Sequence, residues 1–204
     1  MSSYYKDGDS YTVDPAHSGA RFHLHAMGVP VFRGTLPLSG GELVIDINGG
    51  IRTANFQLDA TGITFEGPID QRSTRGLFGT ASHPLIEFET QWARSVGPGL
   101  HELDGVLRLH GQEHVFTLRA ERGAWEGPAN DSRWYRGLVS GGLDRKAWEL
   151  RSHSLADGAL LLLGHEVHFE VALCAGPRAT SQPPAQTDRR PEDRSASDDA
   201  DRVE

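Results

Sequence analysis

The sequence of 204 residues contains a single cysteine, Cys174, so no disulfide can form within the chain. Cys174 follows Val171 and Leu173 in an alternating segment, and we expect it to be buried as a small apolar side chain. Long apolar runs are also scarce, because the longest covers only residues 159–163, far short of the about 20 residues of a membrane span. The first ten residues are polar and lack the apolar core of a signal peptide. These features predict a cytoplasmic protein without stable membrane insertion.

Positive charge is in deficit, because 28 Asp and Glu residues outnumber 20 Lys and Arg residues and leave a net charge of -8. Nucleic-acid binding requires clustered positive charge over the phosphates, so no nucleic-acid partner is expected. The same deficit disfavours electrostatic docking on anionic membranes. Glycine and proline are frequent, with 24 and 11 residues. Their number predicts many turns between short strands rather than long helices.

Composition divides the chain into three parts. Residues 1–10 are predicted to be a flexible leader, and residues 11–175 to form one folded domain. Between residues 176 and 204 the only sizeable aliphatic side chain is Val203, and no aromatic residue occurs. Such a segment buries too little surface to offset its ordering entropy, so a disordered polar tail is predicted there.

Apolar and polar residues alternate along most of the central domain, which is the pattern of strands with one buried face. The first such segment places Phe22 and Leu24 on one face and His23 and His25 on the other. About seven further segments follow, and most neighbours are close enough in sequence to form hairpins. Alternation lapses near residues 69–81, where a short helix or a loop is expected. The pattern predicts an antiparallel all-β fold, either a sandwich or a barrel.

Four groups of residues together resemble the YceI-like family of polyisoprenoid-binding proteins. They are residues 11–18 with Arg33 and Gly34, residues 83–88, residues 103–111 with 115–118, and residues 143–148 with 163–167. Each group is short, but their order and spacing extend over residues 11–175. The resemblance implies an eight-stranded antiparallel, lipocalin-like barrel that holds a long isoprenoid or quinone-like lipid. It also implies a homodimer, and no cofactor besides such a lipid is expected.

The histidines of the first alternating segment are candidate metal ligands. A His-x-His pair on a strand can chelate a metal, and His23 and His25 form such a pair. Relative to the family that the chain resembles, the second histidine is displaced by one position, which turns it to the outer face. No Cys or carboxylate lies at ligand spacing in the same segment. No metal site is therefore predicted.

The inward-facing apolar and aromatic side chains are the predicted ligand site. From alternation alone they would fill the barrel, whereas the resemblance favours a ligand tunnel. The predicted lining residues are Phe22, Leu24, Phe56, Leu58, Ile86, Phe88, Trp92, Leu107, Leu109, Phe116, Leu118, Val167 and Phe169. The side chains expected at the mouth, near a polar head group, are His17, Arg33, Arg72, Arg75 and Arg145.

We therefore expect a non-catalytic protein that binds, stores or transports a long-chain isoprenoid or a similar amphiphilic lipid. One alternative is an isomerase or cyclase acting on a hydrophobic substrate, which needs an ionisable side chain inside the barrel. Glu66, Tyr135 and His153 are the candidates for that role. Another is a protein-interaction barrel with a filled core. No catalytic residues are predicted, because no nucleophile and base occur at a spacing that brings them together.

Overall fold

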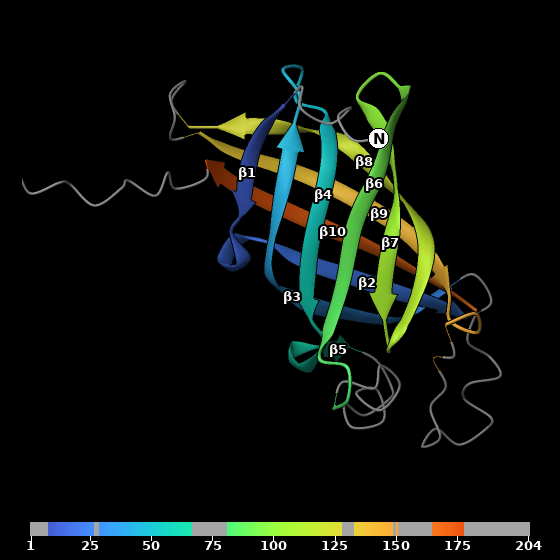
Figure 1. The fold of residues 1–204 in the computed structure, drawn as a ribbon. Coiled ribbons are helices and arrows are strands. Elements are labelled where there is room, and N and C mark those ends of the chain that lie inside the picture. The colour runs from blue at the N-terminus through green and yellow to red at the C-terminus, as the bar shows by residue number, and fades with distance from the viewer. Residues whose placement is uncertain are drawn as a thin grey trace, which may run out of the picture.

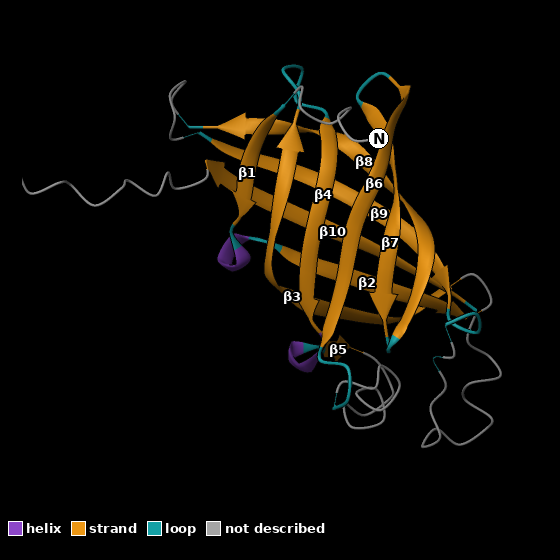
Figure 2. Cartoon of the chain, viewed as in Figure 1, coloured by secondary structure: helices purple, strands orange, loops and turns teal. Residues whose placement is uncertain are grey.

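The computed structural model describes residues 8–26, 29–66, 81–127, 133–148, 150 and 165–177, which are almost entirely β-strand (Figure 2). The strands are β1 (Asp9–Val13), β2 (Gly19–Ala26), β3 (Val29–Ile45), β4 (Ile51–Asp59), β5 (Thr64–Glu66), β6 (Leu85–Gly97), β7 (Leu100–Leu109), β8 (Gln112–Glu126), β9 (Trp134–Asp144) and β10 (Glu166–Pro177). Two short 3-10 helices span Pro15–His17 and Ala60–Gly62. Within the described residues, no helix is long and apolar enough to cross a membrane.

Eight of the strands close into an antiparallel barrel. They follow the order β2, β3, β4, β6, β7, β8, β9 and β10, and β10 pairs with both β9 and β2. In Figure 1, β3, β4, β6 and β7 form one wall, and β2, β9 and β10 cross behind it. Of the two remaining strands, β1 pairs with β10 and β3, and β5 pairs with β3. The predicted eight-stranded barrel is confirmed.

The longest strand, β3, connects the two ends of the barrel. Its first part pairs with β2 and β5, and its second part pairs with β1 and β4. The sequence pattern predicts only the last part of this strand. Pro30 and Pro37 lie within it, and proline is uncommon inside strands because it cannot donate a ladder hydrogen bond.

The strands extend beyond the boundaries expected for the folded domain. β1 begins at Asp9 and β10 continues to Pro177. The two extensions pair with each other, because Tyr11 lies opposite Pro177 and Thr12 lies opposite Gly176. The predicted leader before Gly8, the tail after Pro177, the helix or loop near residues 69–81 (apart from Ala81) and a strand expected at residues 160–163 lie outside the described residues.

One end of the barrel, formed by the turns at residues 46–50 and 98–99, carries a buried polar cluster. We call it the closed end. Asp46 accepts hydrogen bonds from the backbone N–H groups of Asn48 (2.9 Å) and Gly50 (2.8 Å) and forms an ion pair with Arg52 (3.0 Å). Burial alone would raise the pKa of Asp46, but these hydrogen bonds and the Arg52 charge outweigh it, so the pKa is lowered. Asp46 therefore stays ionised and holds the turn.

His101 lies beside this cluster and is only 7% exposed. Within the described residues its Nδ1 has no hydrogen-bond partner. The pKa of His101 is lowered, first because burial disfavours the imidazolium and second because Arg52 is nearby, against the opposing effect of Asp46. The folded protein therefore holds His101 neutral at a pH where the unfolded chain protonates it.

This difference predicts an acid-sensitive stability. A depressed histidine pKa contributes stability that is complete above the unfolded value of about 6.5 and is lost as the pH falls toward the folded value. We expect the variant His101→Phe to show a flatter dependence of the unfolding free energy on pH between about 7 and 5, where Asp46 does not titrate. Denaturant unfolding across that range measures it. Equal slopes for the variant and the parent protein would contradict the prediction.

Candidate hydrophobic ligand cavity

The interior of the barrel contains a cavity of about 50 Å³ whose wall exposes no polar surface. Its wall comes from the eight strands of the barrel and consists of Ala20, Phe22, Leu36, Phe56, Leu58, Ile86, Phe88, Leu107, Leu109, Leu118, Leu143, Val167 and Phe169, with Arg21 at its border. The Arg21 side chain is exposed on the outer face of β2. The wall can therefore contact a ligand only through apolar groups.

The cavity occupies only one half of the barrel. The other half, toward the closed end, is packed solid by fully buried side chains, among them Leu43, Ile51, Leu103, Val139 and Leu173. Tyr135 is buried there too, and its ring contacts Trp125 at 5.1 Å between centroids. The barrel therefore joins a solid half to a hollow half.

Aromatic rings set the width of the hollow half. Phe56 lies 5.7 Å from Phe88, and Phe116 lies 5.8 Å from Phe169, between ring centroids. Glycine makes room for such rings, since a Cβ added to Gly141 would meet Phe169 at 2.9 Å and Phe116 at 3.0 Å. The cavity therefore exists partly because the opposing backbone carries no side chain at this position.

The end of the hollow half is covered by the turn that follows β9. Arg145 and Trp148 of this turn are buried, and so is Leu150 just beyond it. The turn is held by backbone hydrogen bonds from Arg145 to the His165 carbonyl (2.8 Å) and from Leu150 to the Arg145 carbonyl (2.9 Å). The Trp148 ring contacts the His114 ring at 4.4 Å. Arg145 is only 8% exposed, and burial lowers the pKa of its guanidinium.

The structure places most of the predicted lining residues as expected. Those that line the cavity are Phe22, Phe56, Leu58, Ile86, Phe88, Leu107, Leu109, Leu118, Val167 and Phe169. Leu24 is buried in the core beside them, and Phe116 packs against that core. Their contact with a ligand stays a prediction.

The prediction for Trp92 is wrong. Its side chain is 64% exposed on the outer face of β6. The pairing of β6 with β7 shifts between Thr90 and Trp92, and such a bulge places two successive residues on the same face. The inward position passes to Ala93, which packs against the core.

Three wall residues were missed by the sequence pattern. Alternation with Arg21 puts Ala20 on the apolar face of the first segment with Phe22 and Leu24, but the predicted lining did not include this small side chain. Leu36 lies between Thr35 and Pro37, where the proline obscures the alternation. Leu143 lies next to the last residue of β9, one of the weaker alternating segments.

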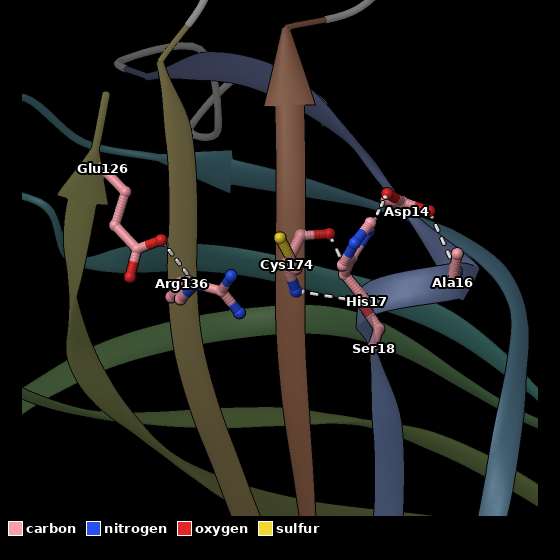
Figure 3. A network of polar contacts seen from close by, with 7 residues as sticks. All are labelled: Asp14, Ala16, His17, Ser18, Glu126, Arg136 and Cys174. Atoms are coloured by element: carbon pink, nitrogen blue, oxygen red, sulfur yellow. Dashed lines mark hydrogen bonds and ion pairs between the residues drawn. The ribbon is translucent and has the colours of Figure 1, made fainter. Parts of the chain in front are cut away.

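Of the side chains predicted near a head group, Arg145 is buried in the turn after β9, close in sequence to the wall residue Leu143, and its contact with a head group stays a prediction. His17 is exposed just before the start of β2 and binds the Asp14 carboxylate at 2.6 Å (Figure 3), and its role near a head group stays a prediction. The prediction for Arg33 is wrong, since it is exposed on the outer face of β3 while its neighbour Gly34 faces inward. Arg72 and Arg75 lie outside the described residues.

Figure 3 also shows how Cys174 is enclosed. Its backbone N–H donates to the Ser18 hydroxyl (2.9 Å), which in turn donates to its carbonyl (3.3 Å), and Asp14 N–H donates to the same carbonyl (2.8 Å). The thiol is buried, as expected, and burial raises its pKa. A raised pKa leaves little thiolate at neutral pH, so the group is unreactive.

The residues considered for catalysis do not meet in the cavity. Glu66 is exposed at the end of β5, opposite Arg33. The Tyr135 hydroxyl lies at the closed end, where it donates to the Gly49 carbonyl and accepts from Gly123 N–H, both at 2.8 Å. His153 lies outside the described residues. No ionisable side chain among the described residues is therefore seen to point into the cavity.

A comparison with protein families identifies the family of this chain. A family model described as a YceI-like domain matches residues 11–175. The chain therefore belongs to the YceI-like family. A search of curated proteins finds no match.

Solved structures of the same fold come from several bacteria. BcnA of Burkholderia cenocepacia is 19% identical, with a TM-score of 0.61 over 80% of this chain and 99% of that one. A polyisoprenoid binding domain from Saccharophagus degradans is 19% identical, with a TM-score of 0.54 over 82% and 98%. The YCEI protein of Campylobacter jejuni is 12% identical, with a TM-score of 0.54 over 68% and 80%. At these identities the comparison shows the fold.

Proposed function

We propose that this chain binds the apolar part of a long-chain amphiphilic lipid, such as an isoprenoid or quinone-like molecule, inside the barrel. The observation that carries the proposal is the cavity wall, which exposes no polar surface. The family, and the printed description of the Saccharophagus degradans domain as polyisoprenoid binding, support the same class of ligand. The homodimer and the cytoplasmic location stay predictions.

The size of the cavity favours long ligands over short ones. A buried water needs about 10–15 Å³ of such space, so a volume of about 50 Å³ accommodates only a few atoms of a chain. A larger ligand must move wall side chains, at a cost of about 1–3 kcal/mol for a strained packing site. Each buried CH₂ group returns about 0.8 kcal/mol. About four buried CH₂ groups offset the rearrangement at that rate, and each further group adds to the affinity, so a long chain is favoured over a short one.

We propose that the ligand leaves chemically unchanged. Glu66 and Tyr135 do not reach the cavity, and its wall supplies neither a nucleophile nor a base. Arg145 is a buried charged side chain close in sequence to the wall residue Leu143. A partly desolvated guanidinium binds a carboxylate or phosphate oxygen strongly, so Arg145 is our candidate for contact with the head group.

The proposal predicts that an apolar-chain lipid stays with the protein during purification. Native mass spectrometry of the full chain should show a discrete mass increment that is lost on denaturation, and the denatured extract should contain the lipid. A parallel titration with a fluorescent long-chain isoprenoid analogue should saturate at one ligand per barrel. Absence of both the increment and the titration signal would overturn the proposal.

A further inference from the structure

Three histidines from two strands meet on the outer face of the barrel. His23 and His25 project from the same face of β2 because they are two residues apart, and His168 of β10 is the pairing partner of His23. The ring centroids are 5.0 Å apart for His23 and His25, 5.3 Å for His23 and His168, and 5.5 Å for His25 and His168. The ring centres thus form a nearly equilateral triangle.

Those separations match the requirement of a metal ion held by three imidazoles. Two imidazoles that bind one zinc ion at about 2.0–2.1 Å with a tetrahedral angle have ring centres roughly 5 Å apart. As the side chains stand, no three His, Cys, Asp or Glu residues of the described ranges are arranged to hold a metal ion. The positions of the rings are suitable and their orientations are not. Rotation about the last side-chain torsion, which is broad in histidine, is the adjustment required.

The surroundings favour a cation at this place. The Glu166 carboxylate lies 3.5 Å from His168 Nε2, and Glu170 acts on His23 as an opposite charge. Arg33 is the like charge that opposes them. On the neighbouring strand, the partner of His168 is Gly142, where a Cβ would approach the Glu166 carboxylate at 2.8 Å and His168 Nδ1 at 3.5 Å. The glycine leaves the His168 ring and its carboxylate room to turn.

The protonation state of the cluster suits metal binding as well. The pKa of His23 is lowered, first by burial and then by His25 and His168, with Arg33 adding to the effect against Glu170. A histidine must be neutral to bind a metal ion, so metal affinity falls as imidazoles become protonated. A lowered pKa keeps the His23 nitrogen available at neutral pH.

We propose that His23, His25 and His168 bind one divalent transition-metal ion, for which Zn²⁺ is the best fit, on the outer face of β2 and β10. Three imidazoles and one water complete a tetrahedral zinc site, and imidazole ligands suit zinc and its first-row neighbours better than Ca²⁺ or Mg²⁺. Glu166 would orient the His168 ring from behind. The proposal does not depend on the lipid cavity, because the histidines lie on the opposite face of the same strands.

The test is a titration of the full chain, free of any histidine tag and stripped with a chelator, with Zn²⁺ by calorimetry at pH 7.5. We expect one ion per chain with a dissociation constant in the micromolar range or tighter. His25→Ala and His168→Ala should each weaken binding at least about tenfold. The control is His17→Ala, which removes an exposed histidine that also has a carboxylate neighbour, and it should bind as the parent protein does.

Folding is verified for each variant by its unfolding midpoint, and His168→Gln provides a second variant that keeps a polar side chain on β10. Affinity should fall as the pH drops, because protonated imidazoles cannot bind the metal ion. Absence of binding in the parent protein would overturn the proposal. Binding that survives in the two alanine variants would overturn it equally, as would a stoichiometry of one ion shared by two chains.

Discussion

Replacing Gly141 by alanine is expected to weaken the binding of an apolar ligand about tenfold or more. A Cβ at this position would approach Phe169 at 2.9 Å, Leu118 at 3.0 Å and Phe116 at 3.0 Å, all of them side-chain atoms. The added methyl group therefore displaces rings without a backbone clash, and the rings move into the cavity. Overpacking of this kind costs about 1–3 kcal/mol, and 1.4 kcal/mol is a factor of ten in affinity.

The neighbouring glycine is a matched control. Gly142 follows in the same strand but faces outward, and a Cβ there would mainly approach the carboxylate of Glu166, a flexible exposed side chain. Gly142→Ala should therefore leave ligand affinity unchanged. A titration with the fluorescent isoprenoid analogue compares the two variants, together with their unfolding midpoints. Equal affinities in both would place the ligand somewhere other than the interior of the barrel.

The second large effect concerns stability and depends on one hydroxyl group. Tyr135→Phe should destabilise the protein by about 2–4 kcal/mol, because the Gly49 carbonyl and the Gly123 N–H both lose their partner and each unsatisfied buried group costs about 1–3 kcal/mol. Burial raises the pKa of Tyr135 to about 12, so its hydroxyl is protonated and able to donate throughout the neutral range. The expected fall in Tm is roughly 5–15 °C.

Tyr11 provides the control for this substitution. Its ring contacts Trp125 at 5.0 Å, on the same aromatic cluster that includes Tyr135. Tyr11→Phe keeps that contact and should change stability by less than about 0.5 kcal/mol. Calorimetric unfolding of the two variants measures the difference. If both variants were equally stable, the two hydrogen bonds of Tyr135 would contribute nothing to the stability of the protein.

The alternation of apolar and polar residues predicted much of this fold, because alternate side chains of a strand share a face. Phe22, Phe88 and Phe169 are inside for that reason. The same rule fails at Trp92, because a bulge is a local change in pairing that leaves no mark on composition. It also fails for β5, which has three residues and is too short to show alternation.

The candidate sites were harder to predict, because they depend on which strands are neighbours. Arg33 was predicted at the mouth, but it is exposed on the outer face of β3, where that strand pairs with β2 and β5. Conversely, His168 is far from His23 in sequence, and only the pairing of β10 with β2 brings them together. The hypothesis of a His-x-His metal pair lacked its third ligand for this reason.

The solid half and the hollow half of the barrel divide two tasks of a binding protein, which are to stay folded and to hold a ligand. Most of the fully buried side chains, such as Leu43, Leu103 and Val139, lie away from the cavity, so they support folding whatever the cavity holds. Substitutions at Leu58, Ile86 or Val167 can then reshape the ligand space at modest cost to the fold. Such an arrangement would let the shape of the ligand space change while the solid half keeps the scaffold.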